Sequence, residues 1–202
     1  MARFDAVGFD LLTALLDTWS LWRSVAGDDD LGMRWHAASQ SRLRGRRYHS
    51  FEDNVRAAAA DIGLVAERTD ELLRRWDESA PWPDVPAALA ALPIARRFVV
   101  TNCSERLGTL AAGRAGRFEL VMTAERAGFY KPDARAYRAA LAALGLDGRR
   151  VLFVAGSAHD VHGASRLGMA VYWANRGRVP PPPDGTALRE EPDLRALAEV
   201  AS

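Results

Sequence analysis

The chain has 202 residues, of which 49% are hydrophobic and 26% are charged. This composition fits a globular protein with at most a modest insertion and excludes wholesale disorder. The 27 basic and 26 acidic residues leave a net charge of +1, so no overall field attracts nucleic acid or an anionic membrane. The single cysteine, Cys103, excludes an internal disulfide framework and a cysteine-rich zinc site.

Strand and helix patterns alternate along the chain. A short apolar run from Phe4 to Phe9 predicts the first strand, and the stretch from about Leu15 to Trp82 has helical spacing. Four further strands, alternating with helices, are predicted at Arg97–Thr101, Phe118–Thr123, Arg150–Ala155 and Ala170–Trp173. This order predicts an α/β fold with a doubly wound parallel sheet.

The helical stretch is too long for an ordinary crossover connection. We therefore expect an all-helical cap, residues 15–83, inserted after the first strand of a core made of residues 1–14 and 84–202. No apolar run is long enough for a membrane span, and Asp5 and Asp10 interrupt the segment where a signal peptide has its apolar region. A cytoplasmic address is the resulting expectation.

Polar side chains of complementary type follow the predicted strands. Asp10 ends the first strand, Thr101 and Asn102 end the second, and Asp160 lies one turn beyond the fourth. Lys131 precedes the helix after the third strand and is the only lysine beside 26 arginines. Because ligands bind outside the carboxyl ends of parallel strands, we expect these groups to face one cleft.

Four motifs in this order resemble the haloacid dehalogenase superfamily of hydrolases, most closely its L-2-haloacid dehalogenase branch. The nucleophile loop is matched by FDLLTALLD at 9–17, and the second motif by VVTNCS at 99–104. The third is matched by YKPDARAY at 130–137, and the fourth by LFVAGSAHDVHGASRLG at 152–168. The resemblance implies hydrolysis of the carbon–halogen bond of a small 2-haloacid through an ester intermediate on the nucleophilic aspartate.

The resemblance also implies a role for each matched residue. Asp10 is the nucleophile, Lys131 keeps it ionised, and Asp160 accepts Lys131 and helps position the hydrolytic water. Thr101 and Asn102 donate hydrogen bonds to the substrate carboxylate and the departing halide. The residues expected to bind the substrate are Leu11, Leu12, Arg34, Tyr137 and Ser157.

The cap of this family contributes an arginine that holds the substrate carboxylate or the halide. Arg34 lies nearest to the family position, and Arg23 and Arg42 are alternatives. The expected partner is a small-molecule carboxylate substrate, with no nucleic acid and no membrane. The resemblance alone suggests a homodimer.

Departures from the family pattern define two alternative functions. Leu12 stands where the phosphatases carry a general-acid aspartate, and Ser157 where they usually place a metal-binding aspartate. Both favour a dehalogenase with no cofactor over a phosphatase that uses Mg²⁺ and small phosphoesters. Thr13 and Ala14 replace the family's Gly-Thr, so the hydroxyl expected to orient the nucleophile is missing or displaced. These two residues and Ala155 support the second alternative, a non-catalytic protein that binds a small carboxylate. The retained Asp10, Lys131 and Asp160 count against it.

Overall fold

The computed structural model describes residues 3–44 and 46–202. Residues 1–2 of the predicted core and residue 45 of the predicted cap therefore lie outside the described part. Among the described residues, no helix combines the length and the apolar character that a membrane crossing requires.

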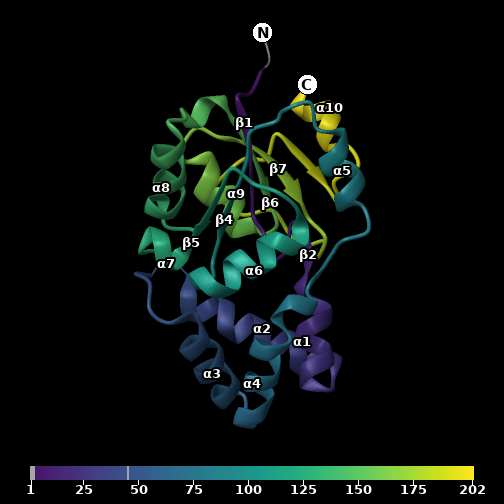
Figure 1. Cartoon of the computed structure of the whole chain (residues 1–202), viewed down its shortest axis with the longest axis vertical. Coiled ribbons are helices and arrows are strands. Elements are labelled where there is room, and N and C mark those ends of the chain that lie inside the picture. Colours follow the sequence, from purple (N-terminus) through teal and green to yellow (C-terminus); the bar gives the residue numbers. More distant parts are fainter. Residues whose placement is uncertain (1–2, 45) are drawn as a thin grey trace.

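A parallel sheet forms the centre of the core (Figure 1), with the strand order β5-β4-β1-β6-β7-β8. The strands are β1 Ala6–Phe9, β4 Arg97–Thr101, β5 Leu120–Thr123, β6 Val151–Ala155, β7 Ala170–Ala174 and β8 Arg189–Glu191. The predicted doubly wound fold is confirmed, and the five predicted strands correspond to β1 and β4 to β7. The sixth, β8, escapes prediction because its sequence, REE, has no apolar pattern.

Alternate side chains of the strands face two separate apolar layers. Val99 and Val154 pack in the layer that α5, α6 and α10 cover, whereas Val100 and Phe153 pack beneath α8 and α9. The helices of the core are α5 Val85–Ala91, α6 Glu105–Ala115, α7 Ala124–Ala127, α8 Ala134–Leu144, α9 Ala158–Ser165 and α10 Leu197–Ala201, with a 3₁₀ turn, η2, at Gly148–Arg150.

Gly8 lies in the central strand, β1, where the backbone runs against two aromatic rings. A Cβ at this position would lie 2.5 Å from the Phe98 ring and 2.9 Å from the Phe153 ring. Glycine therefore lets both rings fill the layer directly over the strand that carries Asp10 at its end.

The helical segment leaves and rejoins the core through two short paired strands. β2 (Leu16–Asp17) pairs antiparallel with β3 (Ala80–Pro81). Between them lie α1 Thr18–Ala26, α2 Asp29–Leu43, α3 Phe51–Asp61, α4 Ala66–Arg74 and the 3₁₀ turn η1 Trp76–Glu78. Figure 1 shows α1 to α4 gathered below the sheet, at the end where β1 finishes. The predicted boundaries, 14/15 and 83/84, flank this strand pair.

Candidate active site

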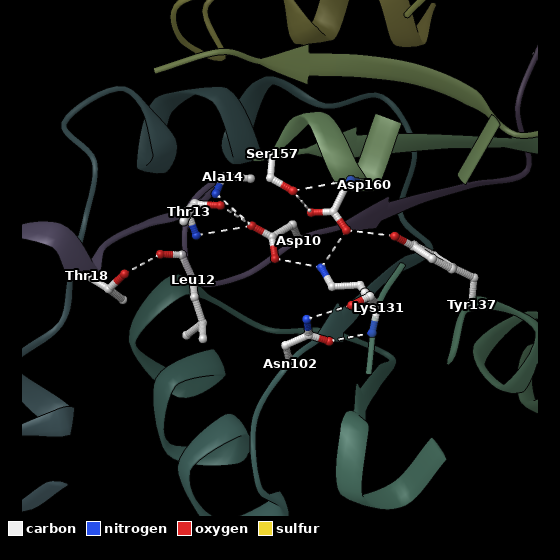
Figure 2. Close-up of polar contacts among 10 residues, drawn as sticks. All are labelled: Asp10, Leu12, Thr13, Ala14, Thr18, Asn102, Lys131, Tyr137, Ser157 and Asp160. Atoms are coloured by element: carbon white, nitrogen blue, oxygen red, sulfur yellow. Dashed lines mark hydrogen bonds and ion pairs between the residues drawn. The ribbon is translucent and has the colours of Figure 1, made fainter. Parts of the chain in front are cut away.

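The predicted polar residues meet where the parallel strands end (Figure 2). Asp10 follows β1, Asn102 follows β4, and Asp160 lies in the first turn of α9, beyond β6. Lys131 reaches the same place from the segment between α7 and α8. The three charged side chains are almost fully enclosed, since Asp10, Lys131 and Asp160 are only 5%, 4% and 3% exposed.

The two carboxylate oxygens of Asp10 have different surroundings. Oδ1 accepts a single hydrogen bond, 2.8 Å long, from the Lys131 ammonium. Oδ2 accepts three: from the backbone N–H groups of Thr13 and Ala14, both at 3.1 Å, and from the Thr13 hydroxyl at 2.7 Å. The orienting hydroxyl is therefore displaced to Thr13 rather than missing, and Oδ1 is the oxygen with room for a new bond.

Gly156 makes room for this arrangement at the end of β6. A Cβ on Gly156 would lie 2.2 Å from the Thr13 hydroxyl and 2.6 Å from Asp10 Oδ2. Any side chain here would push the nucleophile loop away, so the absence of a Cβ at residue 156 is part of what fixes the Asp10 carboxylate.

The Lys131 ammonium lies between two carboxylates. It is 2.8 Å from Asp10 Oδ1 and 3.0 Å from Asp160 Oδ1. Asn102 holds the backbone of Lys131 from both sides: its side-chain N–H donates to the Lys131 carbonyl (3.1 Å), and its side-chain oxygen accepts from the Lys131 N–H (2.7 Å). Asn102 thus positions the ammonium while one of its two amide N–H groups stays available.

Asp160 is held by two hydroxyl groups. Oδ1 accepts a 2.7 Å hydrogen bond from Tyr137, which lies on α8, and Oδ2 accepts a 3.1 Å hydrogen bond from Ser157. The Ser157 oxygen also caps α9 by accepting the N–H of Asp160 at 3.2 Å. These contacts fix both oxygens of the second carboxylate.

Burial and the shared ammonium give the two carboxylates different acidities. Burial raises the pKa of Asp10, but the Lys131 charge and the donors on both oxygens outweigh it, so this pKa lies below its ordinary value. Burial also raises the pKa of Asp160, and Lys131 only partly opposes that effect while the Asp10 charge adds to it, so this pKa lies above its ordinary value. Burial lowers the pKa of Lys131, yet the two carboxylates more than compensate and keep it raised. One carboxylate is thereby suited to be an ionised nucleophile and the other a base.

A cavity of about 430 Å³ opens above these groups and is shared by core and cap. From the core, Asp10, Lys131 and Asp160 line it. From the cap, its polar lining residues are His36 and Gln40 of α2 and Arg44, which directly follows α2. Desolvation lowers the pKa of His36 to about 4, with the charge of Asp10 opposing the shift, so this imidazole is neutral at pH 7.

Arg34 does not line this cavity, so its substrate-binding role stays a prediction. Its side chain is exposed, and it is not among the described residues that line the cavity. The reason is the phase of α2: Trp35 is buried against Trp22, and two residues of helix rotate Arg34 by roughly 200° from His36. Of the two alternatives, Arg42 pairs with Asp61 at 2.7 Å and Arg23 is also outside the described lining.

Two further predicted residues lie beside the cavity rather than on its described wall. Leu11 is fully buried in the apolar layer. Thr101 is 1% exposed, its methyl group packs toward Gly108 of α6, and its hydroxyl has no hydrogen-bond partner. Leu12 and Ser157 do line the cavity. Tyr137 is not in its described lining but donates a hydrogen bond to Asp160, which is.

Among the cavity-lining residues that sequence reasoning missed are four polar residues of the cap and of the end of β7. Three are His36, Gln40 and Arg44: the first two lie four residues apart on one side of α2, and Arg44 follows at its C-terminal end. The fourth, Asn175, follows β7 directly, and its amide bonds the Val179 carbonyl at 2.8 Å. The position of Asn175 at a strand end is a signal that could have found it, whereas the spacing in α2 groups the other three without showing which way they face.

The site residues do not fit a Mg²⁺ ion. The ammonium of Lys131 already lies between Asp10 and Asp160, the two carboxylates that such an ion would join. The carbonyl of Leu12 is taken by the Thr18 hydroxyl at 2.6 Å. Within the described residues, no group of three or more His, Cys, Asp or Glu side chains could hold a metal. Mg²⁺ in proteins binds through one or two carboxylates and completes its octahedron with water, and here the ammonium already pairs with both candidate carboxylates.

The chain is similar to known proteins in both sequence and fold. The family model for haloacid dehalogenase-like hydrolases matches residues 14–168. An (S)-2-haloacid dehalogenase of Pseudomonas putida is 30% identical over 98% of both chains. A phosphoserine phosphatase of Thermus thermophilus is 31% identical over 89% of this chain and 76% of its own. The fold also matches an L-2-haloacid dehalogenase of Xanthobacter autotrophicus with chloropropionic acid covalently bound, with a TM-score of 0.82, 20% identity and 98% of both chains covered.

Proposed function

The chain belongs to the haloacid dehalogenase-like hydrolases, and from this premise we propose that it hydrolyses the carbon–halogen bond of a small 2-haloacid. The observation that carries the proposal is the environment of Asp10. Its Oδ1 accepts one hydrogen bond, from an ammonium, and the side chain two residues later is the apolar Leu12. A halide leaves without a proton, so this reaction needs no general acid beside the nucleophile.

In the first step, Asp10 Oδ1 attacks C2 of the substrate from the side opposite the halogen. The carbon–halogen bond breaks, the halide leaves with the bonding pair, and C2 is inverted in the ester that forms. The pKa of Asp10, lowered by Lys131 and the loop donors against the effect of burial, supports an ionised nucleophile at neutral pH. The free amide N–H of Asn102 is the donor we assign to the halide or to the substrate carboxylate.

In the second step, water adds to Cγ of the Asp10 ester and gives its proton to Asp160. Negative charge then develops on Oδ2, which faces the N–H groups of Thr13 and Ala14 and the Thr13 hydroxyl. The bond between Cγ and Oδ1 breaks, and Asp160 returns its proton to the leaving oxygen. The product leaves as a 2-hydroxyacid whose hydroxyl oxygen came from Asp10, and the regenerated Asp10 carboxyl releases the second proton of the water to solvent. Removing one donor of such an oxyanion site typically costs about 2.7–4 kcal/mol of transition-state stabilisation.

The phosphatase alternative is supported by the name of the Thermus relative. It requires a Mg²⁺ site and a proton donor for an alcohol leaving group. Leu12 and the ammonium between Asp10 and Asp160 supply neither. We therefore propose an enzyme that works without a metal. It is tested by offering phosphoserine with Mg²⁺ and with a chelator in parallel with 2-haloacids. The cytoplasmic address and the homodimer stay predictions.

The decisive experiment is a single turnover of 2-chloropropionate in ¹⁸O-water, with enzyme in excess. The expected result is one ¹⁸O atom in the tryptic peptide from Phe4 to Arg23 and unlabelled 2-hydroxypropionate of inverted configuration. This peptide holds Asp5, Asp10 and Asp17, so fragmentation must assign the label.

Label on Asp10 alone supports the ester mechanism, and Asp5 and Asp17 act as internal controls. The Asp10→Ala variant should release no halide, a loss of about 10⁴-fold or more. Label that appears only in the product would mean direct attack of water and would overturn the proposed nucleophile. Ligand binding without any turnover, across haloacids and phosphoesters, would favour the non-catalytic alternative.

A further inference from the structure

The two N–H groups that reach Asp10 Oδ2 belong to peptide units whose carbonyls are also hydrogen-bonded. The Thr13 N–H shares its peptide with the Leu12 carbonyl, which accepts a 2.6 Å bond from the Thr18 hydroxyl (Figure 2). The Ala14 N–H shares its peptide with the Thr13 carbonyl, which accepts a 3.1 Å bond from the Trp82 indole N–H. Each peptide unit that donates its N–H to Asp10 Oδ2 therefore accepts a hydrogen bond from one side chain at its carbonyl oxygen.

These two donors come from the opposite ends of the cap segment. Thr18 is the first residue of α1, directly after β2, and is 1% exposed. Trp82 directly follows β3, and its backbone N–H donates a 3.0 Å hydrogen bond to the Leu15 carbonyl. The Arg176 guanidinium lies over the Trp82 ring, 4.9 Å from its centre, and pairs with Asp84 at 2.9 Å. Both donors are thus held in place by the junction between cap and core.

A peptide unit transmits polarisation from its oxygen to its N–H. The amide is a resonance system, so a hydrogen bond accepted at the carbonyl makes the N–H a stronger donor. Such cooperative strengthening is estimated at about 10–30% per bond. Thr18 and Trp82 consequently orient the two N–H groups toward Oδ2. They also strengthen the hydrogen bonds that these N–H groups donate, so negative charge on Oδ2 is better stabilised.

We propose that Thr18 and Trp82 are positioning residues for hydrolysis of the Asp10 ester, acting through the Leu12–Thr13 and Thr13–Ala14 peptide units. This inference rests on the proposed function. When the ester forms, Oδ2 changes from a carboxylate oxygen to an ester carbonyl and loses charge. When water then adds to Cγ, Oδ2 gains charge. Weaker donors at Oδ2 therefore slow the second step only, and leave the first step unchanged or faster.

The test measures the two steps separately by rapid quench with enzyme in excess over 2-chloropropionate. Halide release reports ester formation, and loss of the substrate-modified Asp10 peptide reports ester hydrolysis. The variants are Thr18→Val, which removes the hydroxyl, Thr18→Ser, which keeps it, and Trp82→Phe, which keeps an aromatic ring without the N–H. Thr69→Val and Trp76→Phe are matched controls, because their Oγ1 and Nε1 atoms are buried without a hydrogen-bond partner.

Thr18→Val and Trp82→Phe are expected to slow ester hydrolysis by about 3- to 10-fold each, without slowing halide release. Thr18→Ser is expected to restore the hydrolysis rate, and the two controls to leave both rates at the parent value. The modified Asp10 peptide should accumulate in Thr18→Val under steady turnover. A purely structural role would instead slow both steps together.

Equal slowing of the two steps, or unchanged ester hydrolysis in Thr18→Val, would overturn the inference. If Trp82→Phe does not fold, the comparison of Thr18→Val with Thr18→Ser still decides it. A parent enzyme that never forms the modified Asp10 peptide would instead overturn the proposed function. The two failures are therefore distinguishable in one experiment.

Discussion

The cavity has two walls that are built in different ways. On the core side, Asp10, Lys131 and Asp160 are nearly fully buried, and every one of their charged groups has a hydrogen-bonded partner. On the cap side, His36 of α2 and Arg44 directly after α2 have partly or fully exposed side chains. No hydrogen bond or ion pair holds either of them within residues 3–44 and 46–202.

This difference separates the chemistry from substrate selection. A buried and fully bonded charge cluster keeps its geometry before the substrate arrives, which is the condition for electrostatic catalysis. Unbonded polar side chains on a helix can adjust to the substrate and contribute to binding. Changes in the core wall should therefore lower kcat, and changes in the cap wall should mainly alter KM.

Apart from loss of the nucleophile itself, the largest effect is expected from Lys131→Met, which removes the ammonium shared by two carboxylates. kcat should fall about 10²- to 10³-fold because the pKa of Asp10 is no longer held down. The free energy of unfolding should fall by about 3–5 kcal/mol, since two buried carboxylates lose their partner. Steady-state kinetics and urea unfolding measure the two losses.

The double variant Lys131→Met with Asp160→Asn is the control for this prediction. It removes one of the two unpaired charges, so stability should return in large part while activity stays low. An active Lys131→Met enzyme would mean that the ammonium is only structural. The charged groups of the core wall would then not determine kcat, contrary to the comparison of the two walls.

A smaller effect is expected from Tyr137→Phe, which removes a hydrogen bond that lowers the pKa of Asp160. The pKa of Asp160, already raised by burial, should rise further. Asp160 is the proposed acceptor of the water proton and can take it only when ionised, so the acid limb of the kcat profile should move to higher pH. We expect about a 3- to 10-fold loss of kcat on that limb and little change on the alkaline side of it.

The pH dependence of kcat from pH 4 to 9 checks this sign. Movement of the acid limb to lower pH would contradict the assignment of Asp160 as the base. An unchanged KM is also expected, because Tyr137 contacts the core carboxylate rather than the cap.

The contrast between the two walls also explains what sequence alone could predict. The strand-end residues Asp10, Lys131 and Asp160 lie together because parallel strands finish at one edge, a relation that local patterns already encode. The facing side of α2 depends on which residues its neighbours bury, and nothing local fixes that phase. The Thr13 hydroxyl and the β7–β8 pairing likewise depend on contacts between distant segments, Thr13 with Gly156 and Tyr172 with Arg189.

The smallest effects are expected in the cap and form a matched pair. His36→Leu removes a neutral imidazole from the cavity wall and should raise KM about 3- to 10-fold with kcat nearly unchanged. Arg34→Gln, two residues away on the exposed side of α2, should change KM less than about twofold.

The pair is decisive because it compares a neutral side chain that lines the cavity with a charged side chain on the opposite, exposed side of the same helix. The pKa of His36, lowered by burial to about 4, means that this group contributes hydrogen bonding rather than charge above pH 5, so the KM effect should be flat from pH 6 to 8. If Arg34→Gln raised KM tenfold while His36→Leu did not, α2 would have to rotate on substrate binding. Selection by the cap would then depend on motion of that helix rather than on the side chains that already line the cavity.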